Sequence, residues 1–229
     1  MKEQFKNLEQ LIKTEYGNIA GIVIQKNGEP VYESYFNGCT DQKRVHIFSV
    51  TKSIISLLIG IAIGKGYIQS VSQKVLEFFP DYTIRQREHT IQHITLEHLL
   101  TMTAPYKYRY APYTKYFSSP DWVVSALNQL GGRDPIGEFR YAPLIGPDIL
   151  TGIIARASSM SVSAFAEKYL FEPLGISTPP NITFHNIEEQ TAFYNAPYSN
   201  CWVCDSMGNN TAGWGLTLSA RDMTKLGQQ

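Results

Sequence analysis

The feature that most constrains the fold of this chain is a long apolar run, which begins after Ser49 and ends near Lys65. The segment SVTKSIISLLIGIAIGK is apolar on nearly all sides, which is typical of a helix packed in the middle of a protein. Gly64-Lys65-Gly66 provides a stop signal. Because the run is far shorter than the ~20 residues needed to cross a bilayer, the sequence predicts a buried core helix and no membrane span.

The composition limits the partners of the chain. Its 229 residues are 43% hydrophobic, which is enough for one core with two subdomains around it, and the formal net charge is +0. We therefore expect neither a nucleic acid nor an anionic membrane as partner, because both require a basic surface. The N-terminal segment lacks the apolar stretch of a signal peptide, and three cysteines fit a reducing compartment, so we expect a cytoplasmic protein.

The remaining pattern alternates between strand and helix signals. Segments 19–25 and 31–36 are rich in β-forming residues and flank Asn27-Gly28, a strong hairpin signal that follows an amphipathic N-terminal helix. Thr95 and Asp121 are expected to cap helices. The predicted helices span 94–105, 121–130, 147–157 and 161–175.

These elements predict an α+β fold, in which helices flank an antiparallel sheet. We expect an α/β subdomain built from residues 1–68 and 183–229, and a helical subdomain of residues 69–182. The helical subdomain would be an insertion between the two parts of the α/β subdomain.

Two polar residues stand at the front of the core helix, Ser49 and Lys52, one helical turn apart on the same face. The unpaired N–H groups and the positive dipole end of a helix N-terminus favour a developing alkoxide or oxyanion. A lysine in apolar surroundings has its ammonium form penalised, so it can stabilise the alkoxide or accept its proton. Ser-Val-Thr-Lys thus fits the S-x-x-K motif of penicillin-recognising serine enzymes.

The motif alone leaves a second interpretation open. Ser49 could simply cap the helix, while Lys52 extends its aliphatic stem along the core and its ammonium group into water. In that case neither residue would have a catalytic role.

Further segments resemble, in order, the serine β-lactamase-like superfamily, which includes class C β-lactamases, D-Ala-D-Ala carboxypeptidases, related esterases and aminohexanoate-oligomer hydrolases. FSVTKSIISLLIGIAIGKGYI is similar to its nucleophile helix, and ITLEHLLTMTA to the helix that follows. The segment that begins GEFRYAPLIG resembles the stretch with the catalytic tyrosine. WVCDSMGNNTAGWGLTLSARDMTKLGQ is similar to its Gly-rich turn and next helix. The resemblance extends from about residue 18 to the end of the chain.

The resemblance implies a role for each of three residues. Ser49 would be the acylated nucleophile, Lys52 its partner, and Tyr141 the phenol that carries the proton from Ser49 to the leaving group. The backbone N–H of Ser49 would be one donor to the oxyanion. Tyr141 could instead be a core aromatic whose hydroxyl is satisfied elsewhere.

The sequence departs from the family in two respects. Pro143 stands two residues after Tyr141, where the family has Asn or Ser; a proline offers neither a side-chain donor nor a backbone N–H, so substrate recognition should differ or weaken. The chain also ends at Gln229 without the Lys-Thr-Gly or similar strand of the family. We therefore expect a C-terminally truncated sheet, whose exposed edge would favour self-association.

Several other residues could line a binding site. Trp202 stands where the resembling hydrolases tend to have tryptophan, and Tyr106 and Tyr108 belong to a tyrosine-rich loop that could wall a pocket for an acyl chain. In each case packing is an equally good explanation.

Two spacings suggest metal or redox chemistry but are weak. His89, His93 and His98 have partial metal-site spacing, although the helix that is expected to start at Thr95 would keep them off one face. Cys201 and Cys204 form C-x-x-C without a second pair, which favours two free thiols in a loop. We expect neither a metal nor another cofactor.

The sequence thus predicts a serine hydrolase that cleaves a small ester or amide, in which β-lactam-like compounds are included, through an acyl-enzyme at Ser49. The alternative is a catalytically impaired fragment or binding protein of the same fold, which lacks the third active-site motif.

Overall fold

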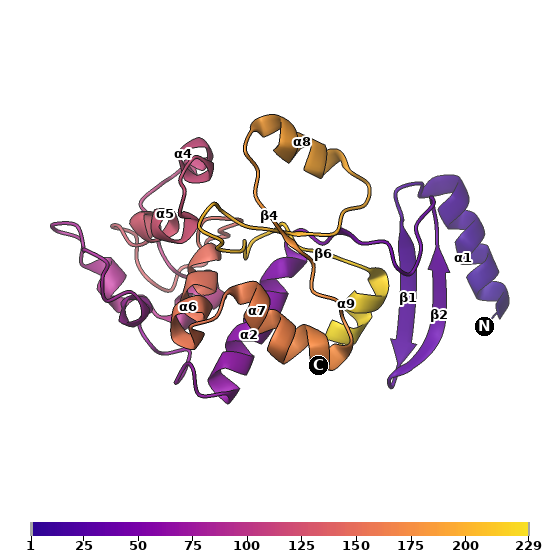
Figure 1. Ribbon diagram of the computed structural model, residues 1–229, viewed down its shortest axis with the longest axis horizontal. Coiled ribbons are helices and arrows are strands. Elements are labelled where there is room, and N and C mark those ends of the chain that lie inside the picture. The colour runs from indigo at the N-terminus through magenta and orange to yellow at the C-terminus, as the bar shows by residue number, and fades with distance from the viewer. Residues whose placement is uncertain (1, 229) are drawn as a thin grey trace.

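The computed structural model describes residues 2–228 and shows three two-stranded sheets among helices (Figure 1). At the N-terminus, β1 (Gly21–Lys26) pairs antiparallel with β2 (Glu29–Tyr35), and Asn27 and Gly28 between them both have positive φ, as a tight hairpin turn requires. The amphipathic helix α1 (Lys2–Glu15) lies beside this hairpin, where Phe5 stacks on Tyr32 with ring centroids 4.2 Å apart. The hairpin prediction is confirmed.

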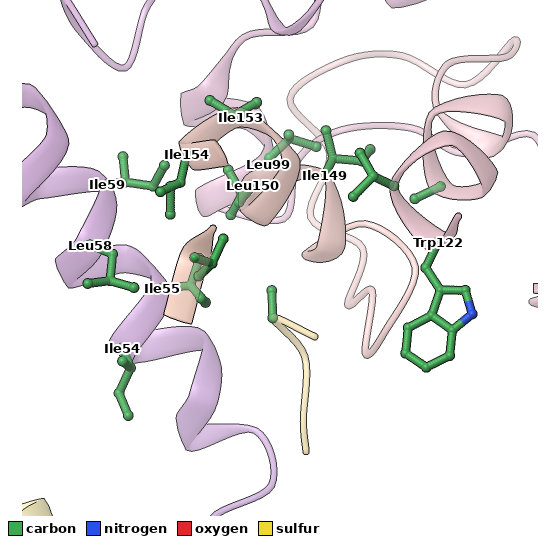
Figure 2. Close-up of a cluster of buried hydrophobic side chains, with 14 of the residues drawn as sticks. Ile54, Ile55, Leu58, Ile59, Leu99, Trp122, Ile149, Leu150, Ile153 and Ile154 are labelled. Carbon is green, nitrogen blue, oxygen red and sulfur yellow. The ribbon is translucent and has the colours of Figure 1, made fainter. Parts of the chain in front are cut away.

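The predicted core helix is α2 (Val50–Gly64), and it is buried along one side. Ile54, Ile55, Leu58 and Ile59 are at most 2% exposed, whereas Ser53, Ser56 and Gly60 on the other side are exposed. Figure 2 shows Ile55 and Ile59 of α2 on the side that faces α6 (Asp148–Ser158), where Ile59 lies beside Ile154. The helix is therefore a wall of the core and also has a solvent side, which the apolar pattern alone did not predict.

Helices dominate the middle of the chain. Thr95 accepts a hydrogen bond from the His98 N–H and Asp121 from the Val124 N–H, so both predicted caps are confirmed. The α-helices of this part are α3 (Leu96–Leu100), α4 (Tyr113–Phe117), α5 (Trp122–Gln129), α6, and α7 (Val162–Ala166). Short 3₁₀ turns are η1 (Val75–Phe78), η2 (Thr90–His93) and η4 (Glu172–Leu174).

Two local predictions in this part were wrong. The single helix expected at 161–175 changes after Ala166 into a turn of π-helix, η3 (Glu167–Phe171), and then into η4. The tyrosine-rich segment is not all loop, because it contains α4, whose Tyr116 is 1% exposed and packs in the core.

Short strand pairs bring distant segments together near the front of α2. β3 (Val45–His46) pairs antiparallel with β6 (Thr217–Leu218), and β4 (Asn181–Ile182) pairs in parallel with β5 (Trp202–Val203). The β3–β6 pair holds the residues that precede Ser49 beside the segment that follows Gly215. This pairing places the front of α2 next to the Gly-rich turn.

The C-terminal part of the chain contains two further helices. α8 (Ile187–Asn195) connects β4 to β5, and α9 (Ala220–Leu226) follows β6. Arg221 of α9 donates to Glu33 at 2.6 Å and to Asp41 at 2.7 Å, which ties α9 to the hairpin (Figure 1). Within the described residues the hairpin pairs with no third strand; self-association through its edge stays a prediction.

The buried apolar side chains form one continuous cluster, to which residues of both predicted subdomains contribute. Ile55, Ile149 and Leu218, for example, belong to the same cluster. The division into two subdomains therefore stays a prediction. No single helix between residues 2 and 228 has the length and apolarity of a membrane span; only α6 taken with segment 162–174, bent by 74°, would pass such a test together.

Candidate active site

The structure places Ser49 at the helix start without making it a cap. Its φ and ψ are helical, and its side chain makes no capping hydrogen bond to α2. The preceding residue, Phe48, has a φ of +43°, which is unusual for a bulky residue, and its carbonyl accepts a hydrogen bond of 2.6 Å from Thr51. This constrained turn presents the Ser49 hydroxyl to solvent, and the capping interpretation of Ser49 is excluded.

Ser49, Lys52 and Tyr141 form one hydrogen-bonded group. The Lys52 Nζ donates to the Ser49 Oγ at 3.0 Å, and the Tyr141 hydroxyl lies 3.1 Å from the same Oγ. Tyr141 is 53% exposed, so it is not a core aromatic. The hydroxyl of Ser49 therefore has two partners that can exchange a proton with it, and one side open to an approaching molecule.

The environment shifts the titration of both partners toward their deprotonated forms. Partial burial lowers the pKa of Lys52 below its usual 10.5, although Tyr141 and Asp148 oppose that change. The hydrogen bond with Ser49, with help from the nearby Lys52 charge, lowers the pKa of Tyr141 below its usual 10.0. Because the two groups interact, they release their protons as a pair.

A glycine carbonyl fixes the position of Lys52. The Lys52 Nζ donates a hydrogen bond of 2.8 Å to the Gly213 carbonyl oxygen, in the Gly-rich turn. A Cβ at Gly213 would collide with the carbonyl oxygen of Pro143, so only glycine allows this close approach. Pro143 thus borders the site through its backbone, and its side chain offers no polar group to a substrate.

A buried carboxylate lies behind this turn. Asp148, the first residue of α6, is 1% exposed; it accepts a hydrogen bond from the Tyr116 hydroxyl and one of 2.6 Å from the Ala212 N–H. Burial raises the pKa of Asp148 to about 6, while these hydrogen bonds oppose the rise. Asp148 holds the 212–213 turn whose carbonyl positions Lys52.

Sequence reasoning missed Asp148 as a site residue. Its position after Pro147 suggested only an acidic residue in the first turn of a helix. One signal was present, because Asp148 is the only charged residue between Tyr141 and Arg156. A charge in such an apolar stretch requires specific partners.

The structure does not bring the other predicted binding residues to Ser49. Trp202 is 0% exposed and its indole N–H donates to the Thr211 carbonyl at 2.9 Å, so the expectation that it touches substrate was wrong and packing explains it. Tyr106 and Tyr108 stack on each other, 5.5 Å between centroids, and line a separate cavity. That cavity is walled mainly by charged residues.

The histidines and cysteines have structural positions. The His98 ring accepts a hydrogen bond of 3.0 Å from the Thr95 N–H and completes a capping box at α3. No group of three metal-binding side chains gathers within residues 2–228. Cys201 and Cys204 are free thiols, as expected; both are buried and directly flank β5.

The Beta-lactamase family model matches residues 8–229, and the chain belongs to the Beta-lactamase family.

Among solved structures, a protein assigned as a β-lactamase from Bacteroides dorei has a TM-score of 0.71 and 18% identity, over 99% of this chain and 62% of that chain. An octameric penicillin-binding protein homologue from Pyrococcus abyssi has a TM-score of 0.66 and 21% identity, over 98% and 55%. A protein assigned as a 6-aminohexanoate-dimer hydrolase from Bacillus anthracis has a TM-score of 0.63 and 18% identity, over 96% and 55%. The chain thus has their fold and spans 55% to 62% of their lengths.

Proposed function

We propose that this protein is a serine hydrolase, which cleaves a small ester or amide through an acyl-enzyme at Ser49. One observation carries the proposal: the Ser49 Oγ lies 3.0 Å from the Lys52 Nζ and 3.1 Å from the Tyr141 hydroxyl, at an exposed helix start. A serine hydroxyl is a weak nucleophile until a neighbouring base activates it. Here two such neighbours, both with lowered pKa values, contact it directly.

The proposed reaction has two steps. The Ser49 Oγ attacks the substrate carbonyl carbon while its proton moves to the Tyr141–Lys52 pair; the pair then returns the proton to the departing alcohol or amine, and the acyl-enzyme remains. Water next attacks the acyl carbon, gives its proton to the same pair, and the Oγ recovers that proton as the acid leaves. The Ser49 N–H, at the positive end of α2, would donate to the oxyanion.

Pro143 replaces the Asn or Ser that the family has at this position, so the protein lacks a polar side chain there to recognise a substrate. This favours simple esters and amides as substrates. It also supports a second candidate function, a binding protein of the same fold with impaired catalysis. Such a protein would hold an acyl compound without forming a covalent bond to Ser49. The two candidates differ in one measurable property, which is the acylation of Ser49.

Covalent labelling tests the proposed function. We expect a fluorophosphonate probe, or p-nitrophenyl acetate, to add one group to the protein. Trypsin cleaves after Arg44 and Lys52, so Ser49 lies in the peptide VHIFSVTK, and the exposed Ser53 lies in the next one. Mass spectrometry should therefore find the adduct in the first peptide, and Ser53→Ala should label as the unchanged protein does. An adduct in another peptide contradicts the proposal, and no adduct favours the binding protein.

A second prediction concerns the phenol. We expect Tyr141→Phe to lower the rate of Ser49 acylation on the order of 10²–10⁴-fold, which is typical of the loss of a proton-transfer group. In the unchanged protein the rate should rise with pH and level off at a lower pH than an ordinary tyrosine and lysine would give, because a base acts in its deprotonated form and both partners have lowered pKa values.

Release of p-nitrophenol from p-nitrophenyl acetate, followed across pH, measures both effects. Tyr110→Phe is a matched control, because Tyr110 is 81% exposed and contacts none of the three site residues. If Tyr141→Phe kept both the rate and the pH profile, Tyr141 would have no part in proton transfer.

A further inference from the structure

A cavity of about 860 Å³, whose lining includes Arg140, the residue before Tyr141, concentrates positive charge. Five of the eight arginines of the chain line it, together with Lys107, whereas its acidic residues are only Glu88 and Asp134. The formal excess is four positive charges in a chain whose net charge is +0. We call it the arginine cavity; its arginines are Arg85, Arg87, Arg109, Arg133 and Arg140.

The acidic residues of the arginine cavity neutralise only two of these cations. Glu88 pairs with Lys107 at 3.3 Å, and Asp134 pairs with Arg140 at 3.7 Å. The four other arginines have no carboxylate partner within residues 2–228, and all four are exposed. Like charges gathered without counterions repel one another, and an anion between them would relieve that repulsion.

Two charged side chains, Arg140 and Glu88, fix the backbone segments that line the arginine cavity before any ligand arrives. Arg140 donates to the carbonyls of Tyr106, Tyr108 and Arg109, and its guanidinium lies 5.0 Å from the Tyr108 ring centroid. Glu88 accepts hydrogen bonds from the backbone around it. Ordered walls lower the entropy cost of binding.

The arginine cavity lies close to the Ser49 site along the chain. Arg140 directly precedes Tyr141, and its N–H donates at 2.8 Å to the carbonyl of Met102. Met102 in turn lines a small cavity together with Lys52. A molecule bound among the arginines would therefore be next to the segment that carries Tyr141.

We propose that the arginine cavity binds a small polyanion, a molecule with two or more phosphate or carboxylate groups. Guanidinium groups pair with both of these anions through two parallel hydrogen bonds. The volume is in the range of small-molecule sites, and four unpaired arginines can contact more than one anionic group. The polyanion is the charged part of the substrate whose ester or amide reaches Ser49; this last statement rests on the proposed function.

Titration calorimetry with inorganic tripolyphosphate and with citrate tests the site directly. We expect saturable binding of one molecule per chain, weakened by added salt. Tighter binding of tripolyphosphate would identify phosphates as the preferred group, and tighter binding of citrate would identify carboxylates. Absence of saturable binding of both would overturn the proposal.

Matched triple variants locate the binding. The variant with Arg85→Gln, Arg87→Gln and Arg133→Gln should raise the dissociation constant on the order of 10-fold or more, since one charged hydrogen bond is worth about that factor. The control with Lys6→Gln, Lys13→Gln and Lys26→Gln removes the same charge elsewhere and should bind as the unchanged protein does. Equal weakening in both variants would mean a general charge effect and would contradict the site.

A further variant keeps the charge and changes the geometry. Arg85→Lys, Arg87→Lys and Arg133→Lys should weaken binding to an intermediate extent, because lysine cannot form the paired hydrogen bonds. Thermal unfolding of every variant checks that the fold is retained. We expect it to be retained, because the replaced arginine side chains are exposed and make no hydrogen bonds with the described part of the chain. Binding to the lysine variant that equals the unchanged protein would contradict recognition by guanidinium groups.

Binding and catalysis can fail separately. Tripolyphosphate binding to Ser49→Ala protein tests the arginine cavity without any reaction. The ratio of kcat/KM for mono-p-nitrophenyl tricarballylate, which carries two free carboxylates, to that for neutral p-nitrophenyl butyrate tests the substrate assignment. This ratio should fall in the arginine-to-glutamine variant. If tripolyphosphate binds but Ser49 takes no acyl group, the proposed function fails and the anion site stands. If Ser49 is acylated but no polyanion binds, the proposed function stands and the anion site is contradicted.

Discussion

Replacing Ser49 by alanine should abolish acyl-enzyme formation and lower ester hydrolysis on the order of 10⁴–10⁶-fold, which is the loss expected when a nucleophile is removed from a group that acts as a unit. Lys52 and Tyr141 both contact this hydroxyl, so without it they have no proton to accept and no alkoxide to stabilise. Stability should change by less than about 0.5 kcal/mol, because Ser49 is exposed and caps no helix.

Rates of p-nitrophenyl acetate hydrolysis and urea unfolding measure the two quantities. Ser53→Ala, one turn further along the same helix and also exposed, should retain both the rate and the stability. Hydrolysis by Ser49→Ala at the original rate would show that the observed reaction does not pass through Ser49.

Replacing Asp148 by alanine should destabilise the protein by about 3–5 kcal/mol. The Tyr116 hydroxyl and the Ala212 N–H would lose their buried acceptor, at a cost of about 1–3 kcal/mol for each unsatisfied group, and a cavity would add to this. Asp148→Asn should cost much less, because an amide can accept from Ala212 and pair with Tyr116. Asp81→Ala is a control, because Asp81 pairs with Arg156 at the surface. It should lower the free energy of unfolding by less than about 1 kcal/mol.

The pH dependence of stability adds a sharper test of Asp148. Its pKa is raised to about 6 in the folded protein, so between about pH 4 and pH 6 the unfolded chain loses this proton while the folded protein keeps it. Its contribution to stability is therefore complete at low pH and falls as pH rises to about 6, by roughly 3 kcal/mol at about 1.4 kcal/mol per pKa unit.

The comparison with Asp148→Asn isolates this contribution, because other titrating groups cancel in the difference between the two proteins. Urea unfolding at a series of pH values should show the stability of the unchanged protein falling relative to the variant as pH rises. Parallel curves for the two proteins would mean that Asp148 titrates in the folded protein as it does in the unfolded chain.

Local chemistry explains the parts of the fold that were predictable. Asn27-Gly28 takes the positive φ values that a hairpin turn needs, and Thr95 and Asp121 accept hydrogen bonds from the third residue after them. In each case the partners are separated by only a few residues, so a short window of sequence contains the whole interaction. The break in the helix expected at 161–175 and the helix α4 lay beyond that reasoning, because propensity is weak where tertiary packing decides.

In the site, too, contacts between residues close in sequence were predictable, and contacts between distant residues were not. Ser49 and Lys52 are three residues apart on one helix, and their contact follows from helical geometry. Tyr141 was proposed through the family resemblance, and it reaches Ser49 across 92 positions of the chain. Gly213, which anchors Lys52 across 161 positions, gave no signal of that contact, and Asp148 looked like an ordinary residue in the first turn of a helix.

Trp202 shows why residue type alone could not identify a binding surface. A tryptophan in a resembling position can cover a substrate or fill a core, and the two differ only in which elements surround β5. The arginine cavity is the opposite case, because its arginines are spread from Arg85 to Arg140 and no short segment of sequence is notably basic.

By itself, the sequence determined the apolar helix with Ser49 and Lys52 at its front, the hairpin and the helix caps, because each depends on interactions within about one turn of the chain. Only the tertiary structure decided what surrounds Ser49: the Tyr141 hydroxyl, the Gly213 carbonyl and the buried Asp148 behind them. It also formed the arginine cavity, which adjoins the segment that carries Tyr141. Their positions depend on strand pairing and core packing between distant segments, and these are set by the burial of the whole chain at once.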